Sequence, residues 1–230
     1  MRAISYDRPD ATLFGWEVGA GPTVVLLHAG GERSDVWRPV AQLLADRHRV
    51  RCVAFDQRGH GRSGGRGERL AQFGDDLAAV LAHEPRPCAV VGSSLGGMAA
   101  MDALRDPGAR RAVAGLILVD VLPDPDPTRA RQFLRDQGMM DAEPPLVSDI
   151  LARSSDLYEL LRASATPVWL VRATRSVLSD AEVRRLVATV PRVSVTTVDA
   201  GHLVARDAPT ELAEVIGEAA SGWLSLPAAP

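Results

Sequence analysis

Short apolar runs recur along the chain, separated by longer stretches with helical spacing. Six runs are dominated by apolar and β-branched residues, as expected for strands of a parallel sheet covered on both faces. They lie at residues 23–28, 51–55, 88–92, 113–119, 168–171 and 193–198. Helical patterns lie near residues 35–46, 68–84, 95–105, 180–190 and 209–224. This alternation predicts an α/β fold with a mostly parallel central sheet and helices on both faces.

The segment before the first of these runs has a different character. Leu13 to Val18 is strand-like, and Gly19-Ala20-Gly21-Pro22 follows as a turn. Glycine and proline next to a short strand are typical of a hairpin. We therefore predict an antiparallel edge strand at this end of the sheet.

One long stretch interrupts the strand–helix alternation. From Leu122 to about Ala165 the strand pattern stops, and a Pro-Asp-Pro-Asp-Pro segment precedes two expected short helices. These helices span roughly Thr128–Gln137 and Val147–Arg162. Long insertions in compact domains usually have a function. We predict one domain over residues 1–230 with a small lid at about 122–165; a helical segment packed on the sheet edge is the alternative.

Composition and charge exclude several classes of protein. The 26 basic residues, all of them Arg, face 29 acidic ones, and a net charge of −3 gives no positive field for nucleic acid. No apolar run reaches the roughly 18 residues of a membrane span, and the first residues lack the apolar stretch of a secretory signal. We expect a cytoplasmic monomer or homodimer that acts on a small molecule and contacts neither nucleic acid nor membrane.

The residue types available also limit the chemistry. Without any Lys, the chain has no Schiff-base nucleophile and no P-loop lysine. The two cysteines, Cys52 and Cys88, lie inside strand-like runs, where reduced core residues are more common than disulfides or metal ligands. We therefore expect no metal and no cofactor.

A G-x-S-x-G motif lies between a predicted strand and a predicted helix. It reads Gly92-Ser93-Ser94-Leu95-Gly96, with Ser94 at its centre. A sharp strand-to-helix turn leaves no room for side chains two residues to either side of the serine, and it raises the hydroxyl above the carboxyl ends of the strands. The helix N-terminus there favours developing negative charge. We predict Ser94 as a nucleophile; the alternative is a serine that only begins the helix.

A second candidate element follows the first long apolar run. His28-Ala29-Gly30-Gly31 is a turn of small residues that could present a backbone N–H towards Ser94. With the N–H of Leu95 it would form a two-donor oxyanion hole, for which Gly30 is the favoured second donor. We expect His28 to hold this loop through side-chain hydrogen bonds.

A histidine follows the last strand-like run. His202 stands in Asp199-Ala200-Gly201-His202, where a loop residue can reach Ser94 and act as general base and then general acid. A lone loop histidine often has only a structural role. The chain order, with the histidine after the serine, favours the catalytic interpretation.

Taken together, these motifs resemble the α/β-hydrolase fold superfamily over nearly the whole chain. Six segments carry the resemblance in the expected order: LLHAGG at 26–31, DQRGHGRS at 56–63, GSSLGG at 92–97, VDVLP at 119–123, PVWLVRA at 167–173 and DAGH at 199–202. The resemblance implies Ser94 as nucleophile, His202 as base, and the N–H groups of Gly30 and Leu95 as oxyanion hole. It also implies that residues 59–61 form a structural turn.

The catalytic acid departs from the family pattern. Members usually carry Asp or Glu shortly after the PVWLVRA-type strand, but residues 174–179 contain no carboxylate. Asp180 follows, yet it resembles the first residue of a helix that Ser179 caps, with Glu182 nearby.

An earlier strand offers another acid. Asp120 is the first residue after the run 113–119, and some superfamily members, haloalkane dehalogenases among them, place their acid there. The order Ser94, Asp120, His202 suits the fold. We favour Asp120; Asp180, or the absence of a functional acid, remain the alternatives.

The identity of residue 94 narrows the reaction. Dehalogenases and epoxide hydrolases of this fold use an Asp nucleophile, whereas Ser94 indicates acyl transfer. We predict hydrolysis of a carboxylic ester, lactone or thioester of a small to medium apolar molecule. Candidate pocket residues are Trp37, Met98, Phe133, Met139 and Met140. The alternatives are a lyase or C–C bond hydrolase that uses the Ser–His pair as a base, and a ligand-binding pseudoenzyme.

Overall fold

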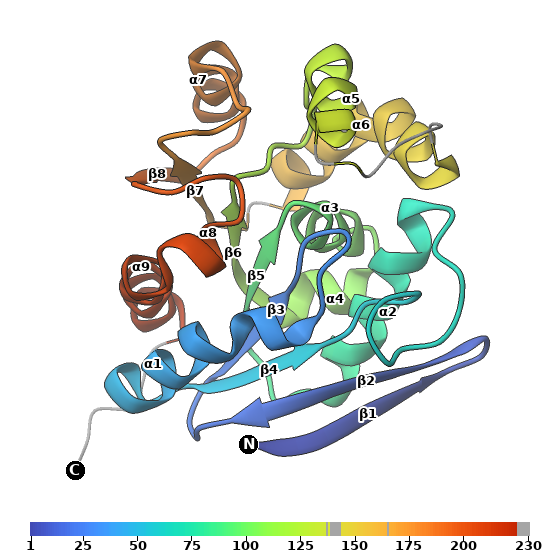
Figure 1. The fold of residues 1–230 in the computed structure, drawn as a ribbon. Coiled ribbons are helices and arrows are strands. Elements are labelled where there is room, and N and C mark those ends of the chain that lie inside the picture. Colours follow the sequence, from blue (N-terminus) through green and yellow to red (C-terminus); the bar gives the residue numbers. More distant parts are fainter. Residues whose placement is uncertain (137, 139–143, 165, 225–230) are drawn as a thin grey trace.

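An eight-stranded sheet forms the centre of the molecule (Figure 1). The computed structural model describes residues 1–136, 138, 144–164 and 166–224. The strand order is β1-β2-β4-β3-β5-β6-β7-β8. The strands are β1 (Arg2–Arg8), β2 (Ala11–Val18), β3 (Thr23–Leu27), β4 (Arg51–Phe55), β5 (Cys88–Ser93), β6 (Val113–Val119), β7 (Val168–Ala173) and β8 (Val193–Val198). All pairs from β4 to β8 are parallel, which confirms the predicted α/β class.

The prediction for the antiparallel edge was partly wrong. β2 is antiparallel, but it lies inside the sheet between β4 and an additional edge strand, β1. The hairpin therefore forms with the residues before β2, and the turn at 19–22 leads instead to β3, which is not a neighbour of β2. β1 carries a weak apolar signal because Tyr6 is its only buried residue.

Helices cover both faces of the sheet. α1 and α9 pack on one face, and α2, α3 and α4 on the other (Figure 1). The helices are α1 (Arg38–His48), α2 (Leu70–His83), α3 (Leu95–Ala103), α4 (Pro107–Ala112), α5 (Pro127–Asp136), α6 (Pro145–Ser164), α7 (Asp180–Thr189), α8 (Val204–Asp207) and α9 (Pro209–Trp223), with a 3₁₀ turn at Ser34–Trp37. Every predicted helix is present. In the ranges that the structure covers, none of these helices combines the length and apolar character needed to cross a bilayer.

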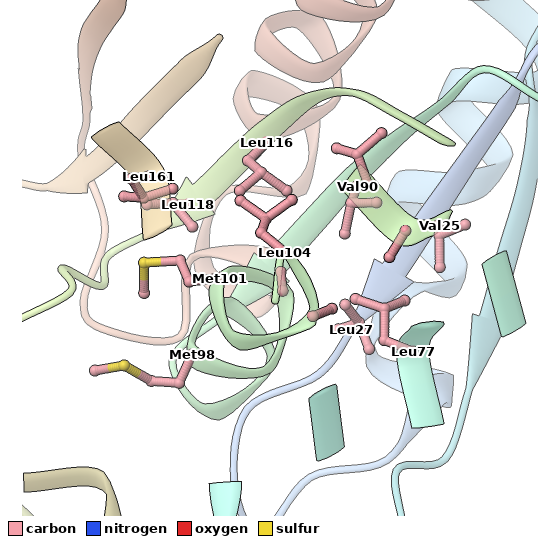
Figure 2. Packing of buried hydrophobic residues seen from close by; sticks show 14 of the residues in the cluster. Val25, Leu27, Leu77, Val90, Met98, Met101, Leu104, Leu116, Leu118 and Leu161 are labelled. Carbon is pink, nitrogen blue, oxygen red and sulfur yellow. The ribbon is translucent and has the colours of Figure 1, made fainter. Parts of the chain in front are cut away.

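The largest hydrophobic core among the described residues lies between the sheet and the helices α2, α3 and α6. Strands β3, β5 and β6 face α2, α3 and α6 there (Figure 2). Its members include Val25, Leu27, Leu77, Val90, Met98, Met101, Leu104, Leu116, Leu118 and Leu161. Burying each such side chain contributes about 1.5–3 kcal/mol. Cys52 and Cys88 are buried and unpaired, as predicted.

The two helices between β6 and β7 lie beyond the carboxyl ends of the strands (Figure 1). α6 is anchored: Leu157, Tyr158 and Leu161 join the core, and Asp149 accepts a hydrogen bond of 2.7 Å from the Leu70 N–H. α5 has no buried residue, so partly exposed side chains make its contacts with the rest of the molecule. Residue 137, the last of the first predicted lid helix, lies outside the described residues.

Candidate active site

Ser94 occupies a strained turn between β5 and α3. Its φ of 49° and ψ of −113° lie in a region that costs a non-glycine residue about 1–3 kcal/mol. The flanking glycines are required sterically, since a Cβ at Gly92 would lie 2.4 Å from the Gly96 backbone and one at Gly96 would lie 2.5 Å from the Leu27 oxygen. The predicted strand–turn–helix context is therefore present, and Ser94 is half-buried at the start of α3.

The sheet register places Asp120 beside this turn. Ser93 at the end of β5 pairs with Val119 at the end of β6, so Ser94 and Asp120 leave the sheet side by side. Asp120 also has a positive φ, of 49°. Its buried carboxylate accepts two hydrogen bonds, from the Ala173 N–H to Oδ1 at 3.0 Å and from His202 Nδ1 to Oδ2 at 2.9 Å.

His202 follows β8 on a loop that α8 supports. The Gly201 N–H donates to Asp207 Oδ2 at 2.7 Å, which fixes the backbone immediately before the histidine. Because a carboxylate only accepts, Nδ1 carries the proton of the bond to Asp120, and the neutral ring keeps a lone pair on Nε2. Phe133 of α5 meets the imidazole edge to face, with the ring centres 4.7 Å apart.

Ser94 and His202 line the same cavity. In the part of the chain that the structure describes, no hydrogen bond joins the Ser94 hydroxyl to His202. Serine–histidine bonds of this kind are often long or misaligned without substrate. The arrangement thus brings together the three predicted side chains, with one of their two hydrogen bonds formed.

Asp180 does not take part in this cluster. It is exposed at the first position of α7 and pairs with Arg172 at 2.6 Å. The hydrogen bond and charge of Arg172 hold the pKa of Asp180 below its usual range. Ser179 and Glu182 form the capping box that begins this helix. The Asp180 alternative is therefore wrong for this structure.

The turn at residues 28–31 lies against the start of α3. Gly30 faces Leu95, since a Cβ at Gly30 would lie 3.9 Å from the Leu95 side chain. His28 supports the turn as predicted: its Nδ1 lies 2.8 Å from the Ala29 oxygen, and its Nε2 accepts the Gln57 N–H at 2.9 Å. Burial lowers the pKa of His28 to about 4, so its ring is neutral.

The cavity has a volume of about 730 Å³ and largely apolar walls. Met98 and Phe133 line it, as predicted, whereas Met139 and Met140 lie outside the described residues. Trp37 does not line it; that prediction was wrong. The 3₁₀ turn carries its indole into the core on the α1 and α9 side of the sheet, where it is fully buried.

Charged residues surround the apolar walls and were not predicted from the sequence. Three arginines that border the cavity each pair with a carboxylate: Arg129 with Glu182 at 2.6 Å, Arg175 with Asp199 at 2.6 Å, and Arg206 with Glu32 at 2.7 Å. No sequence motif distinguishes these arginines from the other 23. Among the described residues, no group of three or more His, Cys, Asp and Glu side chains is placed to hold a metal ion.

Comparisons with known proteins show which proteins the chain is similar to. A model described as "Alpha/beta hydrolase family" matches residues 24–215. A pimeloyl-[acyl-carrier protein] methyl ester esterase of Chromobacterium violaceum is 37% identical over 147 residues, which cover 63% of this chain and 51% of that protein. The chain thus matches about half the length of this curated relative, and 37% of its counterpart in Methylococcus capsulatus.

Solved structures share the fold over nearly the whole chain. A thermophilic esterase from Thermogutta terrifontis superposes with a TM-score of 0.76 and 22% identity, covering 96% of this chain and 99% of that one. A haloalkane dehalogenase loop variant from Bradyrhizobium elkanii gives a TM-score of 0.78 with 19% identity, covering 97% of each chain.

Proposed function

The chain belongs to the alpha/beta hydrolase family, and from this premise we propose that it is a serine hydrolase that cleaves a carboxylic ester, lactone or thioester through an acyl-enzyme. The observation that carries the proposal is the hydrogen bond between His202 and Asp120, formed directly beside the strained turn of Ser94. It supports a base whose Nε2 is free to accept the proton of the serine.

The proposed reaction has two stages. The Ser94 oxygen attacks the carbonyl carbon, its proton passes to His202 Nε2, and the N–H groups of Gly30 and Leu95 bind the oxyanion. Collapse of the tetrahedral intermediate expels the alcohol or thiol, which takes the proton from His202. Water then attacks the acyl-enzyme by the same route and releases the acid.

The walls of the cavity suggest the kind of substrate. Leu122, Val147, Ile150 and Leu178 are among the apolar residues that border it. A cavity of about 730 Å³ suits a small to medium apolar acyl or alcohol group. An ester-cleaving relative supports ester chemistry in general. We propose that the whole chain acts as one domain and that residues 122–165 form a lid over this cavity.

The other interpretations of the site have less support. The support for a ligand-binding pseudoenzyme is the lack of a carboxylate at residues 174–179. The hydrogen bond between His202 and Asp120 instead supports a working base. A lyase or C–C bond hydrolase would use the same Ser–His pair as a base. It would form no acyl-Ser94 intermediate and would give no p-nitrophenolate burst.

The test is a stopped-flow assay with short-chain p-nitrophenyl esters, combined with a fluorophosphonate probe. We expect a p-nitrophenolate burst and a probe adduct on Ser94. Ser94→Ala should lower turnover by up to about 10⁶-fold and keep the fold. Wild-type activity in Ser94→Ala, or an adduct located elsewhere by mass spectrometry, would refute the proposal.

A further inference from the structure

A buried carboxylate lies next to the turn that would hold the oxyanion. The Glu32 side chain is only 6% exposed, and its Oε2 accepts the Ala29 N–H at 3.3 Å. The Glu32 backbone N–H in turn donates to the Ala29 oxygen at 3.1 Å. Glu32 therefore holds Ala29 at both of its polar backbone groups.

These contacts determine the direction of the Gly30 N–H. The Ala29 oxygen and the Gly30 N–H belong to one planar trans peptide, so they point in opposite directions. Because Glu32 N–H and His28 Nδ1 both hold the Ala29 oxygen, the Gly30 N–H is directed away from them. The peptide that would supply one oxyanion donor is thus fixed before substrate arrives.

The charge of Glu32 needs a counterion at this place. A negative charge two residues from Gly30 opposes the oxyanion that forms in the transition state. Arg206 Nε lies 2.7 Å from Glu32 Oε1 and neutralises it. Oε1 has no hydrogen-bond partner among the described residues, so the contact is an ion pair without hydrogen-bond alignment.

The same ion pair connects two parts of the candidate site. Arg206 belongs to α8, four residues after His202, whereas Glu32 belongs to the loop after β3. Gly31, Glu32 and Arg206 also border a second hollow of about 750 Å³, so the pair stands in the wall between this hollow and the catalytic cavity.

We infer that Glu32 and Arg206 are positioning residues for the reaction: Glu32 orients the peptide that carries the Gly30 N–H, and Arg206 cancels the charge of Glu32 beside the oxyanion. This inference rests on the proposed function. It leads to an unusual expectation, because removing the carboxylate should repair the damage caused by removing the arginine.

The experiment compares Arg206→Ala, Glu32→Gln and the double variant in p-nitrophenyl ester hydrolysis. Arg206→Ala leaves a buried unpaired charge beside the oxyanion, and we expect kcat to fall about 10-fold or more with KM changed less than about 3-fold. Glu32→Gln keeps an oxygen acceptor for the Ala29 N–H, so its kcat should fall only about 2–3-fold. The double variant should match Glu32→Gln.

A second measurement separates positioning from general damage to the fold. Phenylboronic acid adds reversibly to the serine oxygen, which gives a tetrahedral boronate anion in the place of the oxyanion. Its inhibition constant should rise in Arg206→Ala in proportion to the loss of kcat, and recover in the double variant. The matched control is Arg47→Ala, which breaks a surface ion pair with Glu214 of 2.8 Å between α1 and α9.

The outcomes distinguish the two proposals. If wild-type protein shows Ser94-dependent turnover but Arg206→Ala is unaffected, or the double variant is no better than Arg206→Ala, the positioning role is wrong and the hydrolase proposal stands. If wild-type protein shows no Ser94-dependent turnover, both are wrong.

Discussion

His202 Nδ1 lies 2.9 Å from Asp120 Oδ2, although 82 positions separate the two residues in the chain. The parallel sheet creates this proximity, because β6 ends immediately before Asp120 and β8 ends four residues before His202. Asp120 is held on its other oxygen by the Ala173 N–H at the end of β7. Three strands therefore determine the place of one carboxylate.

Replacing Asp120 should test whether this carboxylate orients the base. In Asp120→Asn the amide can donate to Nδ1, which favours the tautomer with its proton on Nε2, and kcat should fall on the order of 10⁴-fold. Asp180→Asn is the control, since Asp180 is exposed and paired with Arg172; its kcat should stay within about 2-fold of wild type. A large loss confined to Asp180→Asn would reverse our assignment.

The tight turn at Ser94 should tolerate no added methyl group. A Cβ at Gly96 would lie 2.5 Å from the Leu27 backbone oxygen, so Gly96→Ala must displace β3 or α3. We expect a loss of about 1–3 kcal/mol or more in the free energy of unfolding, measured by urea denaturation, together with loss of fluorophosphonate labelling.

Gly222 provides the matched control for that change. It is a glycine within α9 and has nothing within 4 Å of an added Cβ. Gly222→Ala should therefore raise the free energy of unfolding by about 0.5–1 kcal/mol, because alanine favours the helix. Equal effects of the two substitutions would show that the turn at Ser94 is not sterically constrained.

The sequence predicts the central strands, the longer helices beside them and the turn at Ser94 because each has a strong local signal. The short helices α4 and α8 were not predicted. Short, continuous apolar runs identify buried strands such as β5. The glycines Gly92 and Gly96 identify the tight turn. β1 was not predicted, because its side chains are mostly exposed and its sequence therefore lacks the apolar run typical of a buried strand.

The remaining features of the site depend on tertiary packing. Whether Trp37 faces a cavity or the other core depends on which face of the sheet its short 3₁₀ turn meets. The strand order decides which of Asp120 and Asp180 lies near Ser94. Because β6 pairs with β5, the residue after β6, Asp120, leaves the sheet next to Ser94. Glu32 and Arg206 are ordinary charged residues in the sequence, and only the folded chain brings them together.

Phe133 should affect catalysis more than stability. It meets the His202 ring edge to face from α5, a helix with no buried residue. Phe133→Ala removes a contact worth about 0.5–1.5 kcal/mol and should lower kcat/KM about 2–12-fold. Its melting temperature should stay within about 2 °C of wild type.

Gln132→Ala is the control on the same helix, because Gln132 is exposed and its hydrogen bonds to described residues stay within α5, to Asp136 and Arg135. Its kcat/KM should match wild type. If both variants lose the same activity, the effect belongs to the helix as a whole and not to the contact with the base.

Acid should destabilise the protein through His28 in a defined pH range. Burial lowers the pKa of His28 to about 4 from an ordinary value of 6.5. The unfolded chain therefore takes up this proton more readily than the folded chain between pH 6.5 and pH 4. Stability from the neutral ring is complete above pH 6.5 and declines as the pH falls, by up to about 3 kcal/mol near pH 4.

Urea denaturation at half-unit intervals from pH 7 to pH 4.5 measures this dependence. The slope of unfolding free energy against pH measures how many protons the chain takes up on unfolding. In His28→Gln this number should be smaller by about one. The amide oxygen of the new side chain can still accept the Gln57 N–H. Asp56 does not contribute to the slope in this range. Burial alone would raise the pKa of its carboxyl, but the hydrogen bonds donated by Arg62 and Ser34 outweigh burial and hold the pKa below its ordinary value of 3.8. Parallel curves for wild type and His28→Gln would show that another group causes the acid loss.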